Sequence, residues 1–134
     1  MAAVMKHPKF LNSIEVARLA GVSYRQLDYL VREGVVEPRG HDGGTGNPRC
    51  WAPEQLPVLR FAAILREHGA RKETIGPAVV ELESMHDRAW GARVLVSLDG
   101  GIHTLLGDEA NGWVVDLAHC RDLLPVAESA LTAA

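Results

Sequence analysis

Cysteine, aromatic residues and long apolar runs are all scarce in this chain. Its 134 residues include two cysteines, Cys50 and Cys120, and only 5% Phe, Trp and Tyr. Two cysteines provide no disulfide framework and fit a reducing cytoplasm. No apolar run approaches the roughly 20 residues that a membrane-spanning helix needs, and residues 1–6 are not followed by the apolar stretch of a secretory signal. We therefore expect a cytoplasmic protein with no membrane partner.

Motifs of catalytic or metal-binding chemistry are also missing. The sequence has no Gly-x-Ser-x-Gly, His-Glu-x-x-His or phosphate-loop motif, which argues against an enzyme. Residues 43–46 form a glycine-rich run, but no Gly-Lys-Ser/Thr follows and no apolar strand precedes it, so we discount a nucleotide site. No Cys-x2-Cys pair with matching His spacing offers a zinc site. We expect no cofactor and no bound metal.

Lysine is absent from residues 73–134. Residues 1–72 carry 11 Lys and Arg against 7 Asp and Glu, whereas residues 73–134 carry 3 Arg against 10 Asp and Glu. This asymmetry indicates that the front half meets a polyanion; a chance split of solvated surface charge is the alternative. The apolar fraction of 47% is sufficient for a folded core, as one domain or one domain with an appendage.

Two short helices with their own start signals stand out near the N-terminus. Asn12–Glu15 is a capping box, and Ser23 with Gln26 is a second one. Gly21 lies in the turn between the two helices, and Gly34 supplies a stop after the second. This pattern is typical of a helix-turn-helix. Any helical hairpin in a bundle would show it too, so the pattern alone favours DNA binding only mildly.

The second helix has one apolar and one polar face. Leu27, Leu30 and Val31 recur at helical spacing and should pack inward, while Ile14 or Val16 should do so in the first helix. We interpret the second helix as the one that lies in the major groove. The residues that point outward from it are candidates for contact with phosphates or base edges: Tyr24, Arg25, Asp28 and Arg32.

A hairpin is predicted directly after the helix-turn-helix. Residues 35–38 read as a short β-like exit closed by proline, and residues 39–51 as a glycine-tipped hairpin. A hairpin in this place is a wing, which lies along the sugar-phosphate backbone. Arg39 and Arg49 at its base are suited to contact phosphate.

Residues 12–83 resemble the MerR family of winged-helix transcriptional regulators, and most closely its actinobacterial and actinophage branch. The matching segments are Glu15-Val16-Ala17, Gly21-Val22-Ser23, Leu27, Tyr29, Arg32-Glu33-Gly34, Pro38, Arg49-x-Trp51, Pro53-Glu54-Gln55-Leu56 and Leu65-Arg66-Glu67-His68-Gly69. The resemblance implies a winged helix that binds double-stranded DNA. Two departures weaken the phosphate grip: Asp28 stands where many members have Arg, and the wing tip carries Asp42 and no basic residue.

The residue pattern and the resemblance together predict a set of DNA contacts. Asp28 would either accept from a cytosine amino group or hold Arg25 or Arg32 in place. Members of the family that sense metals do so through cysteines that have no counterpart here. The predicted DNA-binding residues are Arg18, Ser23, Tyr24, Arg25, Asp28, Tyr29, Arg32, Arg39 and Arg49.

Two further helices are expected. The third opens at Ala52-Pro53 and ends at Gly69, with Arg60 and Arg66 on solvent. The fourth runs from Lys72 to about residue 90, which is too short for the long dimer helix of the family. Its apolar stripe either contacts a second protomer or packs within the chain, and the two readings are equally supported.

Residues 91–134 differ in composition from the rest. Residues 93–98 and 102–106 flank Asp-Gly-Gly and predict a hairpin, residues 113–117 a third strand, and residues 118–131 a helix. Such a small unit cannot bury its sheet face alone, so we favour a role in self-association over a sensor pocket. The expected fold is mainly α (α+β): a leader (1–11), a MerR-like winged helix-turn-helix (12–90) and a small ββ(β)α association unit (91–134).

These observations predict a sequence-specific double-stranded DNA-binding regulator of transcription that acts as a dimer or higher oligomer and contacts RNA polymerase. One alternative is an excisionase-like factor that bends DNA for recombination. A second is a protein-interaction adaptor without DNA affinity, which Asp28 and the weakly charged wing favour.

Overall fold

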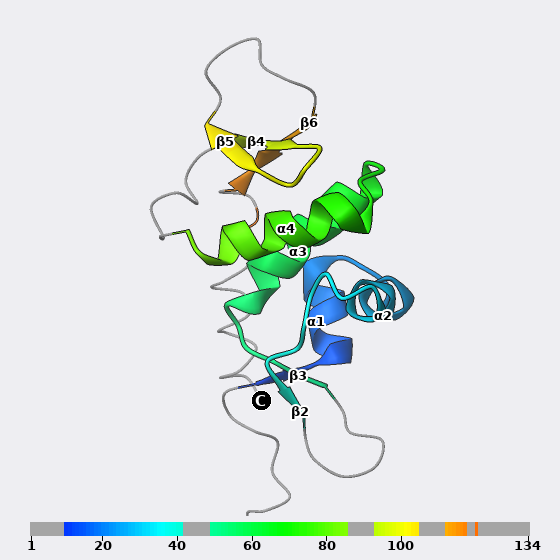
Figure 1. Cartoon of the computed structure of the whole chain (residues 1–134). Helices are drawn as coiled ribbons and strands as arrows, with labels where there is room; N and C mark the ends of the chain where they lie inside the picture. Colours follow the sequence, from blue (N-terminus) through cyan, green and yellow to red (C-terminus); the bar gives the residue numbers. More distant parts are fainter. Residues whose placement is uncertain (1–9, 42–48, 86–92, 105–111, 118–119, 121–134) are drawn as a thin grey trace, which may run out of the picture.

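The computed structural model of the chain describes residues 10–41, 49–85, 93–104, 112–117 and 120. Four helices and six short strands follow one another in these ranges, in a mixed α and β arrangement (Figure 1). A helical layer lies between two small three-stranded sheets, one near the N-terminal part and one formed by the C-terminal strands. The predicted α+β class is therefore confirmed. No helix within the described ranges is long and apolar enough to cross a membrane.

Both predicted capping boxes are present at the start of the helix-turn-helix. In α1 (Ser13–Ala20), Asn12 Oδ1 accepts from Glu15 N, and the Glu15 carboxylate accepts from Asn12 N. In α2 (Tyr24–Arg32), Ser23 and Gln26 make the same reciprocal pair. These bonds satisfy backbone donors that the first turn of a helix leaves without partners.

Two glycines shape the turns on either side of α2. Gly21 (φ 76°) ends α1 and Gly34 (φ 76°) follows α2, both in left-handed conformations that a side chain would strain. Residues 35–38 then run without strand pairing, so the predicted β-like exit is wrong. Val35 and Val36 in this segment are buried against the core. Hydrophobic packing, and not hydrogen bonding to a neighbouring strand, therefore holds the segment in place.

The wing is a hairpin with a third strand added to it. β2 (Gly40–His41) and β1 (Leu11–Asn12) both pair antiparallel with β3 (Arg49–Trp51), in the order β1-β3-β2. The sequence reading missed β1, which lies at the boundary of the predicted leader. Leu11 is buried there opposite Trp51, so the end of that segment belongs to the core.

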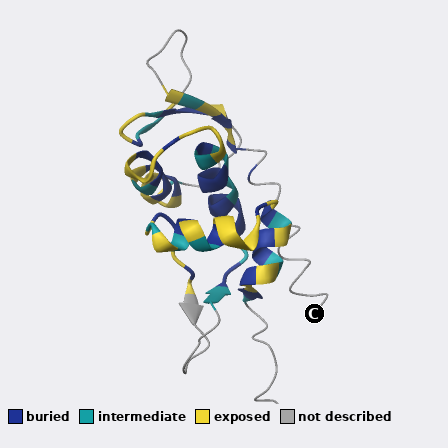
Figure 2. Cartoon of the chain, turned by 90° about the vertical axis from the view of Figure 1, so that its right-hand side faces the viewer, coloured by how far each residue is buried: buried dark blue, intermediate teal, exposed yellow. Residues whose placement is uncertain are grey.

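The core lies between α3 (Gln55–Glu67), α4 (Lys72–Glu83) and the helix-turn-helix. Pro57 is accommodated in the first turn of α3, where a missing N–H costs least. Pro77 lies inside α4, in its second turn. Buried residues follow the inner sides of the helices and exposed ones the outer sides (Figure 2). The α4 stripe of Ile75, Val79 and Leu82 is buried within this chain, and the rest of the predicted fourth helix falls partly on residues 86–92, outside the described ranges.

The C-terminal strands form the second sheet. β4 (Arg93–Ser97) lies between β5 (Ile102–Thr104) and β6 (Gly112–Asp116), so the predicted hairpin and third strand are confirmed. The buried Val94, Val96 and Val115 join the same core as the helices. The sheet is also tied to α4 and the end of α3 by hydrogen bonds from Thr74 Oγ1 to Leu98 O, from Ile102 N to Glu81 and from Trp113 Nε1 to His68 O.

This sheet therefore packs on the winged helix of its own chain. Leu117 and Cys120 are buried in the shared core, and burial raises the pKa of the Cys120 thiol to about 12. The predicted helix over residues 118–131 lies outside the described residues, apart from Cys120.

Candidate nucleic-acid interface

The outer face of α2 presents the side chains that were predicted to meet DNA. Tyr24 is 54% exposed, and Arg25 and Arg32 are exposed beside it. Leu27 and Leu30 lie on the opposite face and are buried. The helix is thus anchored by its apolar side, with a tyrosine and two arginines on the free side. Arg18, in the last turn of α1, is exposed as well, and the Ser23 hydroxyl accepts from Gln26 N in the cap.

Asp28 joins α2 to the wing. Its Oδ2 lies 3.0 Å from Arg32 Nε, one turn further along α2, and its Oδ1 lies 2.9 Å from Arg49 Nη1 on β3. Of the arginines proposed as its partners, Arg32 is confirmed, and the other contact is with Arg49 and not Arg25. The Arg49 contact is ionic only, since Nη1 is buried and has no hydrogen-bond partner in good geometry. One carboxylate therefore neutralises much of the charge of two predicted phosphate contacts.

Tyr29 is covered on one face by an arginine from α3. The Arg66 guanidinium lies 3.8 Å from the centre of the Tyr29 ring, and its Nη1 donates to Glu33 Oε1 at 2.6 Å. The Arg66 side chain is 33% exposed, so the prediction that it lies free on solvent is wrong: a cation–π contact and an ion pair hold it against α2. Tyr29 keeps an exposed fraction of 46%, and its other edge stays accessible.

A second cross-link starts from the middle of α3. Arg60 Nη1 donates to Ala20 O at 3.2 Å and lies 3.6 Å from Glu67 Oε2. Arg60 is therefore half-buried at the turn of the helix-turn-helix and not on solvent as predicted. Its role is to hold the end of α1 against α3.

The base of the wing is fastened to the helices by two buried polar side chains. Trp51, which is 1% exposed, donates from Nε1 to Ser13 Oγ at 2.9 Å. Gln55 bonds three backbone groups on either side of the wing. Arg39 itself is exposed, so its guanidinium is available at the surface while its backbone is fixed.

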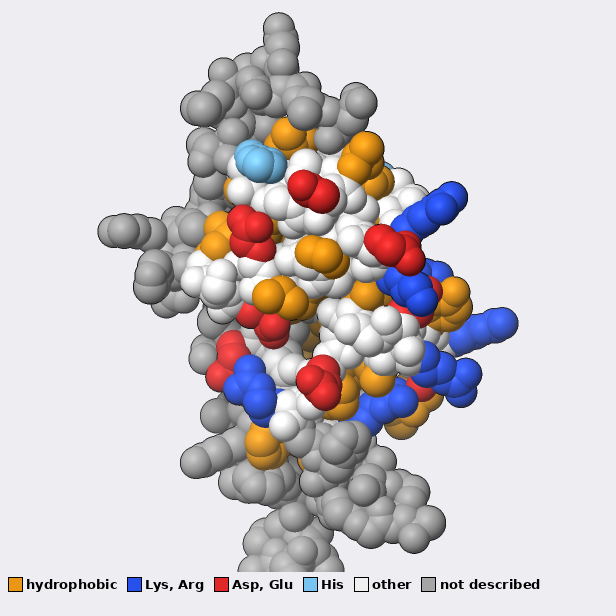
Figure 3. All heavy atoms as spheres, in the orientation of Figure 1, with side chains coloured by type: hydrophobic (Ala, Val, Ile, Leu, Met, Phe, Trp, Pro, Cys, Tyr) orange, Lys and Arg blue, Asp and Glu red, His pale blue; other side chains and the backbone are white. Residues whose placement is uncertain are grey.

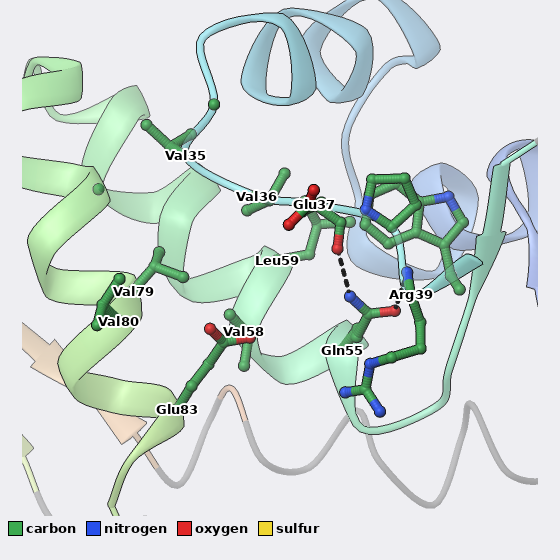
Figure 4. A pocket seen from close by; sticks show the side chains of 14 residues that line it. Val35, Val36, Glu37, Arg39, Gln55, Val58, Leu59, Val79, Val80 and Glu83 are labelled. Atoms are coloured by element: carbon green, nitrogen blue, oxygen red, sulfur yellow. Dashed lines mark hydrogen bonds between the residues drawn. The ribbon is translucent and has the colours of Figure 1, made fainter. Parts of the chain in front are cut away.

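A groove of about 530 Å³ runs between the wing base and α4 (Figure 4). Val36, Val58 and Val79 are among its apolar wall residues, and Gln55 lies in its wall with two of its hydrogen bonds drawn. The sequence reading placed none of its predicted contacts in this groove except Arg39. Among the described residues no group of three or more His, Cys, Asp or Glu is arranged to hold a metal ion.

Many of the basic side chains lie near α2. In Figure 3 most of the visible Lys and Arg side chains gather along the right-hand edge, where α2 lies, and others lie at the lower left; Asp and Glu side chains are spread over this view and also lie at the right-hand edge. The exposed cations of the described winged helix are Arg18, Arg25, Arg32, Arg39, Arg71 and Lys72.

Ser13, Gln55 and Arg66 are the interface-supporting residues that sequence reasoning missed. Their partners are distant in sequence. Gln55 and Arg66 had a local cue, because they fall in the family-like Pro53–Leu56 and Leu65–Gly69 segments, whereas Ser13 had none.

Comparison with known proteins agrees with this geometry. Residues 12–77 match the model of the MerR HTH family regulatory proteins. No curated protein matches the chain. The matched residues run from the cap of α1 through the wing and α3 into the first half of α4, and a domain of this type indicates a DNA-binding regulator of transcription. Residues 12–77 of this chain are therefore similar to the helix-turn-helix domain of that family.

Proposed function

We propose that the chain is a sequence-specific double-stranded DNA-binding transcriptional regulator in which α2 enters the major groove. The observation that carries the proposal is the outer face of α2. Tyr24 and Arg25 lie there exposed on a helix that is capped at its start and anchored by buried leucines. Arginine and tyrosine are suited to reach base edges and flanking phosphates. Neither of these two side chains is packed into the described core.

In this proposal the wing makes the second set of DNA contacts. Arg39 and Arg49 flank its base, and Arg18 lies on the neighbouring helix. These side chains contact the backbone and position α2 without reading sequence. Arg32, Ser23, Asp28 and Tyr29 complete the proposed interface, with Asp28 setting the position of Arg32 and Arg49 in place of contacting a base.

A substitution at Arg25 tests the proposal. Arg25→Ala should lower the affinity for a selected duplex by about 1–3 kcal/mol, or roughly 5-fold to 150-fold, if the side chain makes a bidentate base contact. Arg93→Ala is the matched control, because it removes the same charge from an exposed residue of β4. Genomic fragments selected with the purified chain supply the duplex, and fluorescence anisotropy measures affinity. Equal affinities of Arg25→Ala, Arg93→Ala and the parent chain would refute the assignment of α2.

We further propose that the regulator acts as a homodimer or higher oligomer on half-sites one or more turns apart. Each turn spans about 34–36 Å. The C-terminal sheet is the proposed association unit: its inner face is used on α3 and α4, while Val114 on β6 is 57% exposed and Leu98 59%. Sedimentation of the parent chain and of Val114→Lys tests this, with a monomeric variant expected. RNA polymerase is the further partner that a regulator of this kind contacts, which pull-down with the purified polymerase tests.

The two alternatives predict different observations. An excisionase-like factor would protect repeats beside an attachment site in a footprint, whereas a regulator protects a promoter operator. A protein-interaction adaptor would give no complex with random genomic fragments at low salt. The pairing of Asp28 with two arginines removes one reason for favouring the adaptor, because the carboxylate is already neutralised.

A further inference from the structure

Among the residues that the structure describes, the Gln55 side chain makes its hydrogen bonds with the backbone at the base of the wing. It is the first residue of α3 and is 8% exposed. Its Nε2 donates to Glu37 O at 2.7 Å and its Oε1 accepts from Arg39 N at 3.1 Å (Figure 4). The same Oε1 accepts from Ala52 N at 3.0 Å. An amide side chain offers two donors and two acceptor lone pairs, so three of its four hydrogen-bonding positions are used on this one task.

The three backbone groups come from both ends of the wing. Glu37 and Arg39 lie on the segment that enters β2, and Ala52 follows β3 directly. The ladder between β2 and β3 has two residue pairs, Gly40 with Cys50 and His41 with Arg49. β1 pairs with the other edge of β3 and supports that strand, but β2 is held by its two pairs alone, and so short a ladder is marginal. Beyond its last pair, Arg39 N bonds to Gln55 in place of the opposite strand, so the side chain acts as an additional rung.

We infer that Gln55 is the positioning residue of the wing, which sets the direction of the hairpin and of Arg39 relative to α2. The inference rests on the proposed function, because the direction of the wing matters for binding only if the wing lies along DNA. Gln55 touches no DNA itself. It acts through the backbone on either side of the wing, and α3 provides the rigid body to which that backbone is tied.

A purely structural role for the same side chain predicts something different. If Gln55 only stabilised the fold, its loss would lower the melting temperature and weaken every DNA contact in proportion to the unfolded fraction. If it positions the wing, its loss would release Arg39 N and Ala52 N locally, and would remove phosphate contacts of the wing while leaving those of α2. Hydrogen exchange and the salt dependence of binding separate the two roles.

Two variants of Gln55 suit the experiment. Gln55→Leu is close in size and removes all three hydrogen bonds. Gln55→Glu keeps an oxygen facing Arg39 N and Ala52 N but replaces the donor toward Glu37 O with a second oxygen, so it should release only the Glu37 side. If Gln55→Leu does not fold, Gln55→Ala, which removes the same three hydrogen bonds, takes its place. Circular dichroism first establishes that each variant is folded at the temperature of the assay.

The DNA-independent measurement is amide hydrogen exchange in the full chain. Exchange at Arg39 N and Ala52 N should accelerate at least tenfold in Gln55→Leu, with Leu27 N in α2 unchanged. In Gln55→Glu the exchange at these two amides should accelerate less. Arg25→Ala is the matched control, because it changes the interface without touching the wing. Unchanged exchange at Arg39 N and Ala52 N in both variants would overturn the inference, whatever the DNA measurements give.

The second measurement is affinity for a selected duplex as a function of salt. Gln55→Leu should bind about 5-fold to 10-fold more weakly at 0.1 M salt, and its slope of log K against log salt should be shallower by about 0.9 for each phosphate that the wing releases. Adding Arg39→Ala to Gln55→Leu should weaken DNA binding little further, because the phosphate contact of the wing is already lost in Gln55→Leu. Additive effects with an unchanged slope would overturn the positioning role. A parent chain that forms no DNA complex would refute the proposed function, and the exchange result would then show only whether Gln55 fixes the hairpin.

Discussion

Replacing Asp28 with asparagine tests how the interface controls its own charge. The side chain keeps its size, but the carboxylate between Arg32 and Arg49 becomes neutral. Both guanidiniums then lose their anionic partner, and the repulsion between Asp28 and a nearby phosphate disappears. We expect Asp28→Asn to bind non-specific DNA more tightly and to discriminate less between selected and random duplexes.

The expected magnitudes follow from the two contacts. The Arg32 pair is an i,i+4 pair with 78% exposure of the arginine side chain, worth about 0.3–0.5 kcal/mol of stability. The Arg49 pair is better shielded from solvent, with side-chain exposures of 23% and 25%. It contributes about 1 kcal/mol of stability at most. Removal of both should lower the melting temperature by about 3–6 °C. Each guanidinium that turns to a phosphate should steepen the salt slope by about 0.9, and raise non-specific affinity about 5-fold to 10-fold at 0.1 M salt.

Fluorescence anisotropy with a random duplex and a selected duplex, at several salt concentrations, measures both slopes. Asp99→Asn is the control, because it removes the same charge at the tip of the C-terminal hairpin, where Ser97 Oγ and Gly101 N donate to the carboxylate. The proposed role of Asp28 is wrong if Asp28→Asn binds random DNA no more tightly than the parent chain and with the same slope.

Three further predictions concern stability and reactivity. Ser13→Ala removes the acceptor of the buried Trp51 Nε1, so it should cost about 1–3 kcal/mol in urea unfolding, and a cost below about 0.5 kcal/mol would contradict this. Arg66→Ala removes the Glu33 pair and the contact over the Tyr29 ring, and should cost about 1–2 kcal/mol; Arg66→Lys should recover only part of it, because lysine lacks the planar fork. Burial raises the pKa of the Cys120 thiol to about 12 from an ordinary value of 9.0. The unfolded chain therefore loses the thiol proton first, and the free energy of unfolding should fall as pH rises from 9 toward 12. Cys120→Ser should not show this fall.

The helix-turn-helix was predictable because its signals are local. Each capping box lies within four consecutive residues, and the glycine turns and the alternation of Leu27 and Leu30 with exposed residues need no partner from elsewhere. The hairpin of the second sheet was predictable for the same reason, since Asp-Gly-Gly separates two apolar runs. In these stretches the propensity of the segment and its place in the fold agree.

What the sequence did not reveal depends on pairs far apart in the chain. Asp28 and Arg49 are 21 positions apart, and Gln55 reaches Glu37 across 18. β1 is two residues long and becomes a strand only because β3 offers it a free edge, while residues 35–38 have the composition of a strand but no neighbour to pair with. Such features follow from the tertiary arrangement, which overrides local preference.

The proposed regulator depends on a cationic outer face of α2 that reads a DNA sequence. A quantitative titration of the purified full chain with a selected duplex, and with a shuffled duplex of the same composition, tests this at physiological salt. We predict at least a thousandfold preference for the selected duplex, reduced by Arg25→Ala and kept by Arg93→Ala. Equal binding of the two duplexes, or no binding to either, would contradict the proposal.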